Sequence, residues 1–172
     1  MCSSDLIQDG RVTFVSSAEL YTPSRLFTVA IDIKPGDAKN AVNLQSNAAV
    51  PVAILSAPAQ GTPTANTAAF DATTVNPATV TLAGAAPVAP GSNGNGRGQG
   101  NGGIASAVPL AQAVDVNGDG RLDLLLHFRA SDMQLGAPAS GGIGAGTAEA
   151  VLYGETWSGD SIRGSDVSRV IQ

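Results

Sequence analysis

The sequence predicts an all-β domain, an antiparallel Greek-key β-sandwich with Gly-rich surface loops, on the strength of three observations. Short apolar runs alternate with polar residues at a period of two, as in half-buried strands. The 21 Gly and 10 Pro residues interrupt the chain so often that no apolar run reaches the length of a stable helix. Aromatic residues make up only 4% of the chain, which favours thin β layers over a helical bundle.

The length of 172 residues suits one domain with a two-layer core. Residues 1–6 resemble the translation of a sequencing adapter and are predicted to be an assembly scar. That segment contains Cys2, the only cysteine, which has no partner for an internal disulfide. Residues 7–26 form a poorly defined segment in which only 11–16 are strand-like, and residues 27–172 are predicted to form a single β-sandwich module.

The first clear strand is predicted at residues 27–34, where apolar and polar side chains alternate until Pro35 and Gly36 end the run. Pro51 predicts that the run around it begins at a sheet edge or at the first residue of its ladder. Asn76 and Pro77 are expected to act as a hinge between two short extended pieces. The segments predicted to be extended in this part are residues 41–46, 50–55, 73–75 and 79–82.

Two Gly-rich stretches, residues 85–107 and 136–146, are predicted to be surface loops, the first of them flexible. Between them, residues 122–130 carry the strongest strand pattern and are expected to form the central strand. Its core face is predicted to hold Leu122, Leu124, Leu126 and Phe128. Residues 108–114 precede this strand in an ordered segment, and residues 148–156 and 161–171 are expected to close the domain as a hairpin.

Residues 115–123, with the sequence DVNGDGRLD, are called the acidic loop below and carry a calcium-binding pattern. Calcium takes six to eight oxygen ligands, and a loop can supply them from alternate positions if its backbone curls around the ion. Glycine at the sixth position permits that turn. The expected ligands are the side chains at positions one, three, five and nine and the carbonyl at position seven, which are Asp115, Asn117, Asp119, Asp123 and Arg121. The alternative is an Asx-rich turn without metal.

The acidic loop is predicted to be a clip between two strands rather than an EF-hand. An EF-hand needs a bidentate Glu at position twelve, where this chain has Leu126. The missing ligand would come from water or from a carboxylate brought near by the fold, and Asp132 and Asp32 are both open choices. The expected affinity is that of an extracellular module, with a dissociation constant on the order of 10⁻⁴ to 10⁻³ M.

Several segments together resemble a family of uncharacterised β-sandwich modules in secreted and surface proteins of bacteria and archaea. The matching segments are DIKPG at 32–36, VPVAIL at 50–55, FDATTV at 70–75, the acidic loop continuing through DLLLHF at 123–128, GET at 154–156 and GSD at 164–166. The resemblance implies a calcium-bearing sandwich in a large extracellular protein and no enzymatic activity. The acidic loop alone is also similar to the loops of dockerins and of integrin-type propeller repeats, although a single copy departs from both.

Composition and charge limit the classes of partner that the chain can be expected to bind. The net charge is −5 and no Lys/Arg cluster is present, which argues against nucleic-acid binding. No apolar run approaches the ~20 residues that span a bilayer. The expected location is extracellular or at the cell surface, and the expected partners are neighbouring domains of the same polypeptide, an extracellular polysaccharide or a surface protein.

The function predicted from the sequence is a non-catalytic, calcium-binding structural or adhesive module. His127 is the only histidine and is expected to be a hydrogen-bonded strand residue, while Glu149 and Glu155 bracket a strand too widely for an acid/base pair. The alternative is a carbohydrate-binding module that uses Tyr153 and Trp157. Their exposure discriminates between the two, because a binding platform needs open rings and a core plug needs buried ones.

Overall fold

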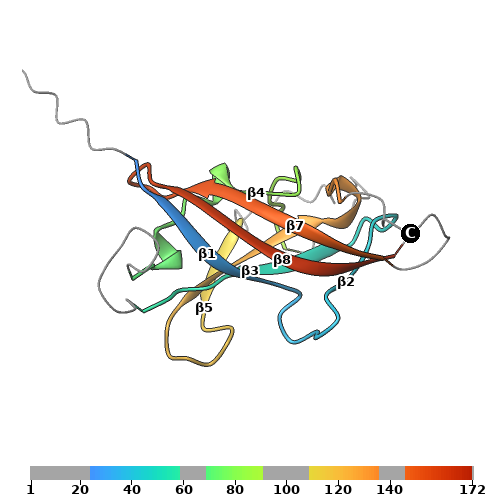
Figure 1. The fold of residues 1–172 in the computed structure, drawn as a ribbon, viewed down its shortest axis with the longest axis horizontal. Coiled ribbons are helices and arrows are strands. Elements are labelled where there is room, and N and C mark those ends of the chain that lie inside the picture. The colour runs from blue at the N-terminus through green and yellow to red at the C-terminus, as the bar shows by residue number, and fades with distance from the viewer. Residues whose placement is uncertain (1–23, 59–68, 91–108, 136–145, 172) are drawn as a thin grey trace, which may run out of the picture.

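The computed structural model describes residues 24–58, 69–90, 109–135 and 146–171. Within these ranges the chain forms eight strands, three 3₁₀ turns and no α-helix (Figure 1), which confirms the predicted β class. The strands are β1 (Leu26–Ile33), β2 (Ala41–Asn43), β3 (Ala49–Ile54), β4 (Thr81–Leu82), β5 (Ala111–Val114), β6 (Asp123–Arg129), β7 (Gly146–Glu155) and β8 (Ser161–Ile171). The 3₁₀ turns are η1 (Ala72–Thr74), η2 (Pro77–Thr79) and η3 (Ala130–Asp132).

The strands follow one path, β4-β7-β8-β1-β3-β6-β5, with β2 added beside β8. This sheet curls, so that β7 and β8 cross over β3 and β6 in Figure 1. It is mixed rather than antiparallel throughout, because β8 runs parallel to both β1 and β2. Strand alternation in a sequence reports which face is buried and not which way a neighbour runs, so the direction of β8 was not predictable from it.

One apolar cluster fills the inside of the curl and draws on both halves of the sheet. In β6, Leu124, Leu126 and Phe128 are buried on the inner face, as the alternation predicts. Leu122 precedes the strand and is 54% exposed, so it does not join this face. The strand that occupies the middle of the path is β1, whereas β6 lies second from one end.

Pro51 lies in an interior strand and not at a sheet edge, but it lies at the start of the ladder that β3 forms with β1, close to the other position predicted for it. Strand β3 is flanked by β1 and β6, and Pro51 is its third residue. The Pro51 carbonyl accepts a hydrogen bond from the Lys34 main-chain N–H at 2.8 Å, which shows that the missing N–H of the proline also points toward β1. Because β1 ends at Ile33, which pairs with Val52, the proline lies just beyond the last residue pair of the β1–β3 ladder.

Strand β1 pairs with two neighbours in succession. Its first half pairs with β8 as far as Ala30, and its second half pairs with β3 from Ile31 onward. The chain then turns and returns as β2 farther along the same edge of β8. At the break, the Asp166 carboxylate accepts hydrogen bonds from Ile33 N at 3.0 Å and from Asn40 Nδ2 at 2.9 Å. The DIKPG and GSD segments are therefore in direct contact.

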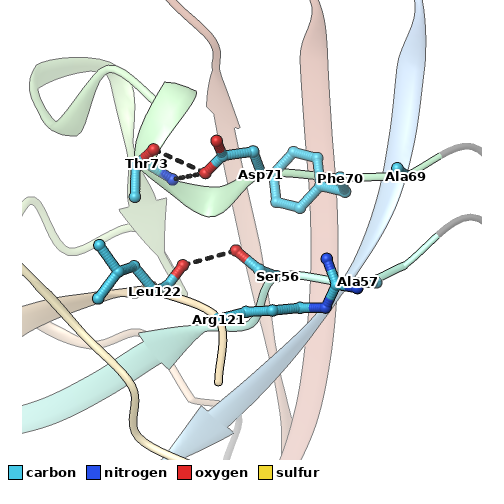
Figure 2. Close-up of a pocket in the computed structure, with 8 residues that line it drawn as sticks. All are labelled: Ser56, Ala57, Ala69, Phe70, Asp71, Thr73, Arg121 and Leu122. Atoms are coloured by element: carbon cyan, nitrogen blue, oxygen red, sulfur yellow. Dashed lines mark hydrogen bonds between the residues drawn. The ribbon is translucent and has the colours of Figure 1, made fainter. Parts of the chain in front are cut away.

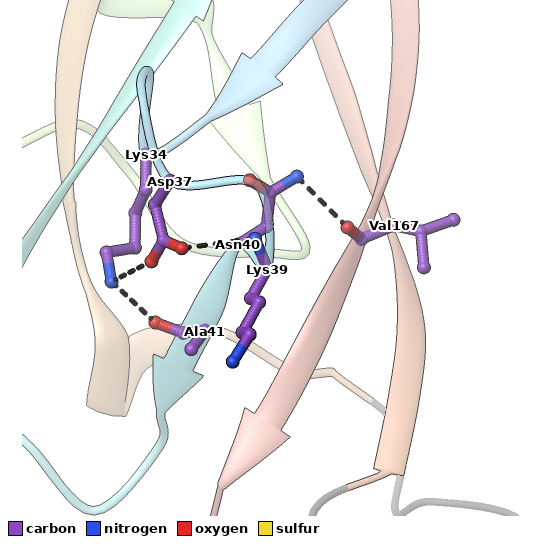
Figure 3. A network of polar contacts seen from close by, with 6 residues as sticks. All are labelled: Lys34, Asp37, Lys39, Asn40, Ala41 and Val167. Atoms are coloured by element: carbon purple, nitrogen blue, oxygen red, sulfur yellow. Dashed lines mark hydrogen bonds and ion pairs between the residues drawn. The ribbon is translucent and has the colours of Figure 1, made fainter.

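The turn between β1 and β2 is held by a short polar network (Figure 3). Lys34, with φ of 55°, donates from Nζ to Asp37 Oδ2 at 2.8 Å and to the Ala41 carbonyl at 3.0 Å. The hydrogen bond from Lys34 lowers the pKa of the Asp37 carboxyl. Asn40, with φ of 44°, also donates to the Val167 carbonyl of β8. The Lys in DIKPG thus stabilises a turn through two of its three ammonium donors.

The extended piece predicted at 73–75 is wrong for Thr73 and Thr74, which belong to η1, whereas Val75 is extended and forms an isolated bridge with Thr156. Asp71 caps it, with Oδ1 accepting from Thr73 N at 2.9 Å and from Thr73 Oγ1 at 2.6 Å. A capping aspartate offers the backbone an alternative to a sheet ladder, and here it outweighs the strand preference of the two threonines. Residues 79–82 do contain β4, which pairs with β7 through Tyr153 and Leu152.

The closing hairpin is confirmed, with β7 and β8 paired over ten residues. The segment expected at 11–16 and most of the two loops predicted at 85–107 and 136–146 lie outside the described residues. The described start of the first loop is ordered, because Pro87 forms a bridge with Phe128 of β6.

Candidate metal centre

The acidic loop closes the hairpin between β5 and β6, as its sequence predicts. Val114, the last residue of β5, pairs with Asp123, the first residue of β6. Both ends of the loop are therefore fixed by one ladder. Position twelve of the pattern, Leu126, is fully buried in β6 and faces the core. The prediction that this loop is not a helix-loop-helix EF-hand is confirmed.

Asp115 organises the first half of the loop. Its Oδ1 accepts hydrogen bonds from Gly118 N at 2.7 Å and Asp119 N at 3.2 Å, and its Oδ2 accepts from Gly120 N at 3.0 Å. Three successive main-chain donors thus converge on one carboxylate. The chain can curl this tightly because Gly118 and Gly120 adopt φ of 75° and 83°, where a side chain would be strained.

The third and fifth positions form two further local turns. Asn117 Oδ1 accepts from Asp119 N at 3.0 Å, and Asp119 Oδ1 accepts from Arg121 N at 2.9 Å. The Asn117 and Asp119 side chains lie 3.4 Å apart between Nδ2 and Oδ2. Both residues and Asp115 are exposed. A carboxylate oxygen that accepts one N–H retains a second lone pair, so these groups can still take a hard cation.

Asp123, at the ninth position, has a different environment, because its side chain is fully buried. Its Oδ1 accepts from Ser56 N at 2.8 Å and its Oδ2 accepts from Val116 N at 3.0 Å. The carboxylate therefore ties the loop to the chain that follows β3. It is the only one of the four side-chain candidates with this long-range structural role.

Ser56 is a site residue that sequence reasoning missed. Its Oγ donates to the Leu122 carbonyl at 2.7 Å (Figure 2) and accepts from Ala72 N at 2.9 Å. With its main-chain bond to Asp123, it joins β3, η1 and the acidic loop. A serine after a buried strand is common, so no pattern in the sequence distinguishes it.

The structure brings neither proposed extra ligand to the loop. Asp132 lies in η3, past the far end of β6, which at about 3.3 Å per residue places it some 20 Å from the loop. Asp32 lies beside Asp166, and burial together with the Asp166 charge raises the pKa of the Asp32 carboxyl. Among the described residues, no group of three or more His, Cys, Asp or Glu side chains is already gathered as a metal site.

His127 lies on the outer face of β6, and its main-chain carbonyl accepts a hydrogen bond from Val88 N at 2.8 Å. Its Nδ1 is buried and has no partner in the described part of the chain. The residue directly opposite is Pro51, which carries no polar side chain. Burial lowers the pKa of His127. Glu149 and Glu155 lie six residues apart along β7, about 20 Å, well beyond the carboxylate spacing of glycosidases.

The two rings named by the sequence are both open to solvent. Tyr153 is 53% exposed and Trp157 is 69% exposed. Tyr153 lies opposite Arg163 of β8 and Thr81 of β4 on the outer face of the sheet. Trp157 follows β7, where its main-chain N–H donates to the Thr74 carbonyl at 2.9 Å. Neither ring plugs the core.

In the described ranges, no helix has the length and apolar character needed to cross a bilayer. Comparison of the chain with models of known protein families, with curated proteins and with solved structures finds no significant match.

Proposed function

We propose that the acidic loop binds one calcium ion and that the chain is a non-catalytic structural or adhesive module of a larger secreted or cell-surface protein. The observation that carries this proposal is the curl of the loop. Asp115, Asn117 and Asp119 each accept main-chain N–H groups from within it, and Gly118 and Gly120 allow the required turns. This is the alternate-position arrangement that calcium loops use.

The ion would be held by the side chains of Asp115, Asn117 and Asp119, the Arg121 carbonyl and a second lone pair of Asp123. Bound calcium supplies positive charge to carboxylates that otherwise repel one another. The chain's own contribution is the closed β5–β6 ladder, which keeps the first and ninth positions together. A free calcium concentration one hundred times the dissociation constant would stabilise the fold by about 2.7 kcal/mol.

Removing Asp119 is the direct test. With about 10 mM calcium, the melting temperature of the full chain is expected to rise by about 5–10 °C over its value in chelator. Asp119→Ala should abolish this rise because it deletes a ligand while removing only two local hydrogen bonds within the loop. Differential scanning calorimetry measures the melting temperatures of the wild-type chain and of the variant in calcium and in chelator.

Asp132→Ala is the matched control, since it deletes an exposed carboxylate whose ion pair with Arg129 spans 3.7 Å. It should retain the calcium-dependent rise. A wild-type chain whose melting temperature is the same in calcium and in chelator would refute the metal proposal.

A carbohydrate-binding function is the second candidate, favoured by the exposure of Tyr153 and Trp157. Open rings stack on the apolar faces of sugars. Trp157→Ala and Tyr153→Ala are expected to weaken binding to insoluble cellulose, chitin or xylan by about tenfold each, as judged by depletion assays. Val167→Ala, which removes another exposed apolar side chain of the same sheet, is the control. If none of the three polysaccharides removes the wild-type chain from solution, the carbohydrate-binding function is refuted.

A further inference from the structure

A pocket of about 370 Å³ lies beside the acidic loop (Figure 2). Three segments line it, namely the chain after β3, the residues that lead into and form η1, and the end of the acidic loop. Its volume is within the range of roughly 300–1,000 Å³ that is typical of small-molecule sites. The residues that define its chemistry are Ser56, Phe70, Asp71, Thr73, Arg121 and Leu122.

Two charged side chains, Asp71 and Arg121, are among the lining residues, and neither forms an ion pair with a described residue. Asp71 uses Oδ1 to bind Thr73, and its Oδ2 takes no hydrogen bond from any described residue. The Arg121 guanidinium likewise has no hydrogen bond or ion pair with the described part of the chain. Figure 2 shows Asp71 on the η1 side and Arg121 on the loop side. Within the described residues, the lining therefore includes one carboxylate oxygen and one guanidinium that have no partner.

This lining selects against simple ions. An anion attracted by Arg121 would also meet Asp71, and a cation attracted by Asp71 would also meet Arg121. A neutral polyol satisfies both groups, because a hydroxyl can donate to the carboxylate while another accepts from the guanidinium. Phe70 and the half-exposed Leu122 add apolar surface for the C–H face of a ring. We propose that the pocket binds one neutral sugar unit of a glycan and that calcium at the acidic loop strengthens this binding.

The dependence on calcium rests on the proposed metal site. Arg121 occupies the seventh position, so the residue whose carbonyl would bind the ion also carries the guanidinium of the pocket. Its main-chain N–H already donates to Asp119 Oδ1 at 2.9 Å. An ion that fixes Asp119 and the Arg121 carbonyl fixes the base of the Arg121 side chain, which lowers the ordering cost of ligand binding.

The position of Trp157 favours a glycan over an isolated small molecule as the ligand of the pocket. The main chain of Trp157 is bonded to Thr74, the last residue of the same η1 that lines the pocket. This bond places the Trp157 main chain beside η1, and its indole is exposed. A sugar chain held in the pocket by one unit could continue toward this ring.

The test uses the full chain and methyl glycosides of glucose, galactose, mannose and xylose as probes. Saturation-transfer NMR and calorimetry should detect millimolar binding of at least one glycoside with about 10 mM calcium present, and at least tenfold weaker binding in chelator. Arg121→Met and Asp71→Asn should each weaken binding at least tenfold. Asp71→Asn retains an oxygen for capping η1, and Arg121→Met retains the carbonyl at position seven.

The variants distinguish a failure of the pocket proposal from a failure of the metal-site proposal. Arg121→Met should keep the calcium-dependent rise in melting temperature, and Arg163→Met, on the outer face of the sheet, should bind glycosides like wild type. No glycoside binding up to about 50 mM, with the calcium response intact, would overturn the pocket proposal alone. Binding that survives both pocket variants but is lost in Trp157→Ala would also overturn it. Equal binding in calcium and chelator would overturn the coupling.

Discussion

Asp123→Ala is expected to destabilise the fold by about 3–5 kcal/mol even when no calcium is present. The carboxylate is fully buried and accepts hydrogen bonds from Ser56 N and Val116 N. Hydrogen bonds to a charged group contribute about 1.5–3 kcal/mol each, and their loss leaves two main-chain donors without partners. Urea denaturation in chelator measures this loss directly, and the melting temperature should fall by about 10 °C.

Asp119→Ala is the comparison that separates structure from metal binding. In chelator it should lower the free energy of unfolding by less than about 1 kcal/mol, because Asp119 is exposed and its acceptor bonds are local. In calcium, both variants should lose the additional stabilisation. If Asp123→Ala were as stable as wild type in chelator, the buried carboxylate would not be the tie between the loop and β3.

Gly164→Ala should be the most damaging single-methyl addition in the β8 strand. A Cβ at this position would lie 2.8 Å from Ile31 Cγ2 and 2.9 Å from the Val29 carbonyl oxygen. The Ile31 methyl can shift, but the Val29 carbonyl belongs to the paired neighbouring strand. Overpacking of this kind typically costs about 1–3 kcal/mol, and the main-chain contact places this site at the upper end.

Gly154→Ala provides a graded control on the neighbouring strand. Its Cβ would meet Val80 Cγ2 at 3.0 Å and no atom closer, so a side-chain methyl could yield. We expect a smaller loss in the urea midpoint than for Gly164→Ala. Equal losses would show that the contact of β8 with β1 is no tighter than that of β7 with Val80.

Strand positions could be predicted because burial of one face of a strand produces an alternation of apolar and polar residues in the local sequence. The alternation in residues 27–34 and 122–130 corresponds to β1 and β6, and the segments around Ser158 correspond to the β7–β8 hairpin. The acidic loop also falls between two strands where its sequence places it. Each of these features depends on neighbours in the chain, which is why a single sequence suffices for them.

Features that depend on distant contacts could not be predicted. The parallel pairing of β8 with β1, the interior position of Pro51 and the role of Ser56 each require knowledge of which segment lies alongside. The 3₁₀ turn at Ala72–Thr74 had a local signal in the capping Asp71, but the β-branched residues after it outweighed that signal in the prediction. Occupation of the acidic loop by calcium remains a prediction.

The pairing of β1 with β8 has a consequence for synthesis in the cell. Leu26 finds its partner only when Ser161 has emerged, 135 residues later. At roughly 5–20 residues per second, a ribosome needs about 7–27 s to cover that interval. During this interval, the main-chain N–H and C=O groups on one side of β1 have no strand partner in the growing polypeptide. The nascent chain therefore presents an open strand edge to chaperones, and the module is expected to mature after translation of β8 rather than strand by strand.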